Sequence, residues 1–126
     1  MFEKEVTIEI TNEQAPFAPK EQLGIYKLVR YTWFEKQGVV ERATEIISAE
    51  MGIVKTSATN FWAEALVVLV HEYPEGLPWN IDYVKTKLDA DIGSELVKAA
   101  QKLTDIPIQA KRSFLEPSDK DKDIPG

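Results

Sequence analysis

The sequence predicts a mainly α-helical fold with a minor β element: a compact domain of about four to five helices with an N-terminal β-strand and a disordered C-terminal tail. Three observations support this prediction. Apolar residues recur at helical spacing in several segments, an alternating pattern occurs near the amino terminus, and the last residues are charged. A chain of 126 residues, 44% of them apolar, is enough for one core. We expect one domain over residues 1–107 and a flexible charged tail over residues 108–126.

The N-terminal strand is indicated by alternation, because Val6, Ile8 and Ile10 are apolar and the residues between them are polar. A single strand leaves its backbone groups unpaired, so it needs another strand. That partner comes either from Gly24–Phe34 or from another copy of the protein. The proline-containing stretch Asn12–Pro19 is expected to be a connector.

The next segment, Lys20–Gln37, combines two signals. Pro19 followed by polar residues is typical of a helix start, whereas the tyrosines, valine and tryptophan that follow favour a strand. We favour a helix that stops at Gly38. A second helix is predicted over Val39–Met51, where apolar residues follow three-and-four spacing and Gly52 closes the pattern.

The most apolar segment predicts the central helix. One face of it is formed by Phe61, Ala65, Leu66, Leu69, Val70 and Tyr73. Trp62, Val67 and Val68 cover much of the remaining surface. A helix that is apolar nearly all round is buried, or is covered by a partner on one side.

The end of the domain is predicted to contain shorter helices. Pro74–Pro78 is a strong helix breaker, and Asn80 is a good cap for a helix carrying Ile81, Val84 and Leu88. Gly93-Ser94 interrupts the pattern before it resumes at Leu96, Val97, Ala100 and Leu103. We expect two short helices here, or one kinked helix.

Composition excludes several classes of partner. The net charge of −6 argues against a broad nucleic-acid footprint, which needs clustered Lys and Arg. Cysteine is absent, which excludes disulfides, thiolate metal sites and a cysteine nucleophile and suits a reducing cytoplasm. The longest apolar run, Ala65–Val70, is six residues long, whereas a membrane span needs roughly 20. The start Met1–Val6 lacks the features of a secretion signal. We expect a cytoplasmic protein without membrane or nucleic-acid partners.

No set of residues indicates an enzyme. His71 is the only histidine, and a zinc site needs further His or Cys ligands. The pair Asp89 and Asp91 would diverge on a helix, so neither supports acid–base catalysis. We predict no catalytic residue, no metal site and no cofactor. A helix-turn-helix reading is also disfavoured, because the helix after Ser57 carries no Lys or Arg before His71.

Aromatic residues near predicted turns are the most informative feature that remains: Trp33, Phe34, Trp62, Tyr73, Trp79 and Tyr83. Most large aromatics in a small domain belong to the core, and the remainder can anchor a partner. Trp79 lies in a rigid turn outside the apolar helix and is the best candidate for a surface anchor. The candidate protein-binding residues are Phe61, Trp62, Leu66, Leu69, Tyr73 and Trp79.

The segment Asn60–Pro74 resembles the middle of the tail assembly chaperones of long-tailed, lambda-like bacteriophages. Members of that family have an apolar helix that runs into a short turn containing histidine and proline, as at His71 and Pro74. A capped helix of the Asn80–Leu88 type and another helix follow. The strand after Met1-Phe2 and the charged, proline-bearing tail are also similar, and the likeness covers roughly Val6–Leu103.

The resemblance implies a phage or prophage protein that acts in the host cytoplasm and is absent from the finished virion. Its implied partners are the tape measure protein, whose helical apolar segments it keeps soluble, and the tail tube protein. The family has no catalytic residues. In many members a frameshift appends a second domain, which a flexible tail would tolerate. The alternative is another phage structural or morphogenetic subunit, such as a tail or neck component, that acts through oligomerisation. Homo-oligomerisation of the chaperone itself stays open.

Overall fold

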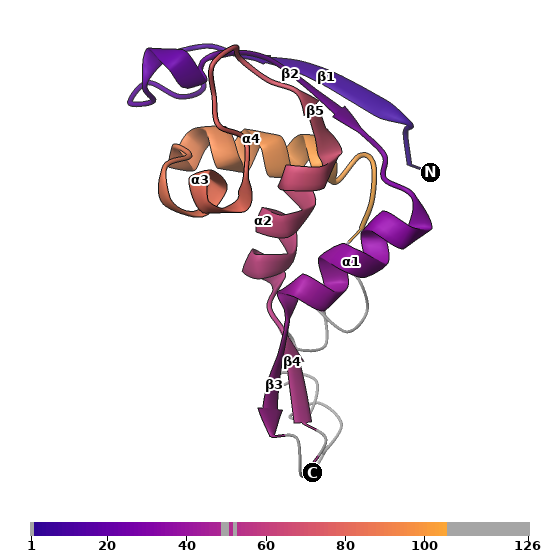
Figure 1. The fold of residues 1–126 in the computed structure, drawn as a ribbon. Coiled ribbons are helices and arrows are strands. Elements are labelled where there is room, and N and C mark those ends of the chain that lie inside the picture. The colour runs from indigo at the N-terminus through magenta and orange to yellow at the C-terminus, as the bar shows by residue number, and fades with distance from the viewer. Residues whose placement is uncertain (1, 49–50, 52, 106–126) are drawn as a thin grey trace, which may run out of the picture.

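The computed structural model describes residues 2–48, 51 and 53–105. Within these ranges the chain forms a small mixed α/β domain with four α-helices, a three-stranded antiparallel sheet and a two-stranded ribbon (Figure 1). The predicted helical content is confirmed in outline, whereas the β part is larger than the minor element that was predicted. The predicted tail, residues 108–126, and the predicted domain boundary at residue 107 lie outside the described residues.

The first sheet has the strand order β1-β2-β5. Its strands are β1 (Glu5–Ile10), β2 (Gly24–Val29) and β5 (Val70–Glu72). β1 is the strand predicted from alternation, and it pairs antiparallel with β2 in an unbroken register from Glu5↔Val29 to Ile10↔Gly24. The partner strand therefore comes from the same chain, which was one of the two alternatives. β5 pairs antiparallel with the other edge of β2.

The predicted helix over Lys20–Gln37 is wrong. Only one turn forms at its start, the 3-10 helix η1 (Lys20–Gln22), before the chain enters β2. Gly24 follows η1 with a φ of 144°, a backbone conformation that glycine adopts readily. Tyr26 and Leu28 are then fully buried on one face of the strand. Burial of alternate residues on a sheet outweighs the helix-start signal.

Helix α1 (Trp33–Ala43) begins at a capping box. The Thr32 hydroxyl accepts a hydrogen bond from the Glu35 amide at 3.2 Å, and the Glu35 carboxylate accepts one from the Thr32 amide at 2.8 Å. Gly38 was predicted to stop a helix and instead lies inside α1. A glycine in a helix interior costs about 1 kcal/mol, which a good cap and a buried face offset.

The predicted helix over Val39–Met51 is divided between two elements. Its first part completes α1, and Thr44–Ser48 forms strand β3, antiparallel to β4 (Ile53–Thr56). Both segments are rich in β-branched residues, which favour strands. The ribbon projects from the body of the molecule beyond α1 and α2 (Figure 1). Gly52, predicted to close the helix, lies outside the described residues.

Helix α2 (Ala58–Leu69) is the predicted central helix, and this prediction is confirmed by its packing against α1, α3, α4 and β5. The Ser57 hydroxyl caps it by accepting a hydrogen bond from the Asn60 amide at 3.2 Å. The helix ends before the predicted limit at Tyr73, because Val70 is extended and starts β5. The apolar side chains on nearly every side of α2 therefore pack against both the helices and the sheet.

Two helices complete the described chain. Asn80 caps α3 (Ile81–Thr86) as predicted, accepting a hydrogen bond from the Tyr83 amide at 2.9 Å. The predicted interruption at Gly93-Ser94 is wrong, because both residues lie inside α4 (Ala90–Ala100). Asp89 caps α4 through hydrogen bonds from the amides of residues 91 and 92. A good cap and one buried apolar face stabilise α4 enough for the helix to continue past Gly93.

The core lies between the sheet and the helices, with α2 and α4 beneath β1, β2 and β5 (Figure 1). Its largest fully buried side chains include Tyr26, Phe61, Ile10, Leu28, Leu69, Ile92, Leu96 and Leu103. They come from the sheet, from α2, and from α4 and the turn that follows it. One face of the sheet is therefore covered by helices, and its other face remains exposed.

Candidate protein-binding surface

The six predicted binding residues divide into two groups by burial. Phe61, Leu66 and Leu69 are 0%, 3% and 0% exposed and belong to the core of this chain. A side chain without accessible surface cannot contact a partner while the domain is folded. Trp62 and Trp79 are half-buried, and Tyr73 is 38% exposed. Only the second group presents accessible surface to a partner.

Trp79 connects the turn after β5 to the central helix. Its indole Nε1 donates a hydrogen bond to the Leu66 carbonyl at 3.2 Å. Its ring stacks on Tyr73 with centroids 5.5 Å apart and an interplanar angle of 21°, and tilts against Tyr26 at 6.0 Å. The indole is therefore held by two aromatic rings and a hydrogen bond, and its position is fixed before any partner binds.

Trp62 lines a groove bounded by α2, α3 and α4, called here the α2–α4 groove. The groove has a volume of about 550 Å³. Its apolar walls include Trp62, Val84, Leu88 and Val97, and small residues of α4, Ala90, Gly93 and Ser94, line it as well. Small side chains let another backbone approach closely, as in helix-in-groove recognition.

The most exposed large apolar side chains on the described helices are Trp33 and Phe34, called here the aromatic pair. They are 73% and 80% exposed. Both stand in the first turn of α1, whose backbone is fixed by the capping box of Thr32 and Glu35. Two adjacent aromatic rings on a rigid turn are an unusual use of apolar surface, because such side chains are commonly buried or bound to a partner.

The aromatic pair was among the aromatics noted in the sequence but not among the predicted binding residues. A signal for its exposure was present. The buried residues of α1 are Val39 and Ala43. The residues three and four positions before Val39, which share its face of the helix, are Lys36 and Glu35. Trp33 and Phe34 are therefore off the buried face.

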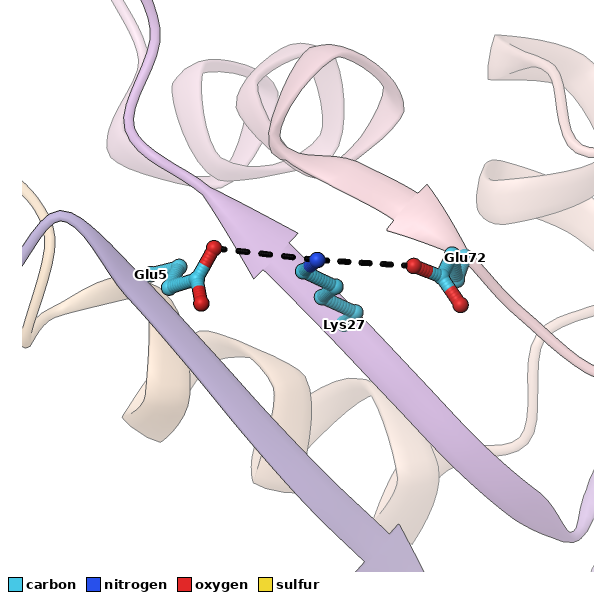
Figure 2. A network of polar contacts seen from close by, with 3 residues as sticks. All are labelled: Glu5, Lys27 and Glu72. Carbon is cyan, nitrogen blue, oxygen red and sulfur yellow. Dashed lines mark ion pairs between the residues drawn. The ribbon is translucent and has the colours of Figure 1, made fainter.

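The outer face of the first sheet is charged (Figure 2). Lys27 Nζ on β2 lies 3.7 Å from Glu5 Oε2 on β1 and 3.6 Å from Glu72 Oε2 on β5. All three side chains reach solvent, so each pair contributes at most about 1 kcal/mol to stability. His71, next to Glu72, is exposed on β5.

Among the residues that the structure describes, the titratable groups with clearly shifted pKa values are the buried Tyr26 and Tyr31. Burial raises the pKa of Tyr26 far above its ordinary value, and the nearby Tyr83 adds to the effect. Burial also raises the pKa of Tyr31, against smaller opposing effects of Thr104 and Arg30. Both phenols point into the core, so these shifts reflect packing. In the described part of the chain, His, Cys, Asp and Glu form no group of three or more placed to hold a metal ion.

Comparison of the chain with protein-family models, curated proteins and solved structures finds no match. No described helix combines the length and the apolar character that crossing a membrane requires.

Proposed function

We propose that this protein is a non-enzymatic phage tail assembly chaperone that binds the tape measure protein and promotes assembly of the tail tube. The observation that carries the protein-binding part is the exposure of the aromatic pair, 73% for Trp33 and 80% for Phe34. The phage assignment rests on the resemblance of Asn60–Pro74 and the helices after it to that family.

The aromatic pair suits a chaperone because it offers apolar area without a large ordering cost. Removing a large apolar side chain from water contributes about 1.5–3 kcal/mol. The capping box holds the first turn of α1, so little backbone entropy is lost on binding. Two such rings in the first turn of α1 would contact an apolar client segment.

The α2–α4 groove supports a helical client. An amphipathic helix binds a groove through apolar side chains spaced three and four residues apart. In the family that this chain resembles, the client has long helical apolar segments. The net charge of −6 would keep such a complex in solution.

Co-expression with the tape measure protein of the same phage or prophage tests the proposal. We expect the client to be soluble with the wild-type protein and largely insoluble with the Trp33→Ala/Phe34→Ala variant. Phe17→Ala is the matched control, because Phe17 is 89% exposed in the connector between β1 and β2. A client that stays soluble without this protein would contradict the proposal. Recovery of the chain in purified particles would favour the alternative, a structural tail or neck subunit.

A further inference from the structure

The outer edge of β1 has free backbone groups at every second residue. The Arg30 amide donates to the Lys4 carbonyl at 2.8 Å, one step beyond the Glu5↔Val29 pair. Hydrogen-bonded residues alternate along an antiparallel pair, so residues 6, 8 and 10 bond to β2. Glu5, Thr7 and Glu9 then direct their N–H and C=O groups away from β2. In the described residues nothing pairs with these groups.

This edge lacks several of the devices that usually protect a sheet edge, and the charges of Glu5 and Glu9 are the one that it has. Over residues 5–10 there is no proline, no lysine and no bulge, and the register with β2 is unbroken. The opposite edge strand, β5, is only three residues long and is followed closely by Pro74. In the first sheet, β1 is therefore the edge strand better suited to accept another strand.

The two faces of β1 define which side chains an incoming partner strand should carry. Glu5, Thr7 and Glu9 are exposed on the outer face, and in the described residues Glu9 has no basic group within ion-pair distance. On the inner face Val6 and Ile8 are only half-buried at the margin of the core. A fitting strand carries basic residues opposite the two carboxylates and apolar residues over Val6 and Ile8.

We propose that β1 binds an extended segment of another protein in which Lys or Arg alternates with apolar residues. A second copy of this chain fits poorly, since symmetric antiparallel pairing about Thr7 places Glu5 opposite Glu9 twice. Like charges directly opposite are destabilising. The proposal uses β1 alone and is independent of the aromatic pair and of the proposed chaperone function.

A peptide titration tests this proposal. The probe is a capped nonapeptide, Lys-Val-Lys-Val-Thr-Val-Lys-Val-Lys, with binding followed by amide chemical shifts of the full chain. We expect shifts centred on β1. A peptide of equal charge with proline in place of its threonine should bind roughly tenfold more weakly, because in antiparallel register that residue lies opposite Thr7 and can no longer donate its N–H to the ladder. Equal binding of both peptides would mean that attraction is by charge alone, and would overturn the proposal.

Protein variants locate the site. Thr7→Pro removes an outward N–H without touching the bonds to β2, and should weaken binding roughly tenfold. Glu5→Gln/Glu9→Gln keeps the backbone and should weaken binding roughly five- to tenfold, whereas the charge-matched Glu41→Gln/Glu75→Gln should not. Unchanged binding by the Glu5/Glu9 variant would contradict the proposed partner. A dimer of the wild type that Thr7→Pro abolishes would show that a second copy occupies the edge.

Discussion

At the scale of single residues, the buried side chain of Gln22 makes three hydrogen bonds that join distant parts of the chain. It is 2% exposed, and its Nε2 donates to the Tyr83 hydroxyl and to the Lys87 carbonyl, both at 2.8 Å. Its Oε1 accepts from the Asp89 amide at 2.9 Å. One glutamine thus holds the end of α3 and the start of α4 against η1. Buried polar groups of this kind stabilise only while every partner is present.

Replacing Gln22 should therefore be costly. Gln22→Leu keeps the size of the side chain but takes away the hydrogen-bond partner of the part-buried Asp89 amide and Lys87 carbonyl, and we expect a loss of about 1–3 kcal/mol in the free energy of unfolding. Urea denaturation measures it. Gln37→Leu on the exposed side of α1 is the control and should change stability by less than about 0.5 kcal/mol. Equal effects of both substitutions would show that the network contributes nothing.

The buried tyrosines predict how stability depends on pH. Burial raises the pKa of Tyr26 and Tyr31 above the ordinary value of 10.0, so the unfolded chain loses these protons first. Their contribution to stability is complete below pH 10.0 and is lost as the pH rises above it. We expect the free energy of unfolding to fall between about pH 10 and 11, by up to about 1.4 kcal/mol per pH unit for each tyrosine.

Tyr31→Phe separates this effect from other titrations at high pH. Its unfolding free energy should fall less steeply above pH 10.0 than that of the wild type. The Tyr31 hydroxyl also forms a hydrogen bond with the Thr104 hydroxyl at 3.2 Å. The variant lacks this bond, so its free energy of unfolding is already lower below pH 10.0. Identical slopes for the two proteins, measured by urea denaturation at a series of pH values, would rule out Tyr31 as a source.

At the scale of elements, the cap of α3 was predictable, whereas strand pairing was predictable only as one of two alternatives. Asn80 begins α3 in the sequence and in the structure, because a cap acts through its own local backbone. The strand Gly24–Val29 was anticipated only as a possible partner of β1, and a helix was favoured there, because its identity depends on β1 and β5, far away in sequence. Val70–Glu72 was assigned to the central helix for the same reason. Short strands of this kind are set by tertiary pairing.

The two helical glycines give a test at this scale. A Cβ at Gly93 would meet only Leu88 Cδ2, at 3.7 Å, so Gly93→Ala should stabilise the protein by about 0.5–1 kcal/mol. A Cβ at Gly38 would lie 3.1 Å from Arg42 Nη1, and Arg42 Nε pairs with the buried Glu64 at 2.9 Å. Gly38→Ala should therefore stabilise the protein less than Gly93→Ala does. Thermal unfolding of both variants measures the difference, and the opposite order would contradict the packing described for α1 and α4.

At the scale of the whole molecule, the core was predictable and the binding surface was only partly so. The apolar face of α2 appears in the sequence as one stripe, and Phe61, Leu66 and Leu69 on it are buried. Which aromatics remain outside depends on how α1 lies against α2, so the sequence pattern directed attention to Trp79 rather than to Trp33. Accessible surface is a property of the assembled fold.

The fluorescence of Trp33 gives a direct test of client binding through the aromatic pair. Trp33 is 73% exposed, whereas Trp62 and Trp79 are half-buried. Acrylamide should therefore quench the fluorescence of Trp33 most strongly in the free protein, and the difference from Trp33→Phe isolates this component. We expect the Trp33 component to be shielded in the purified complex with the tape measure protein. A Trp33 component quenched equally in the free protein and in the complex would contradict binding through the aromatic pair.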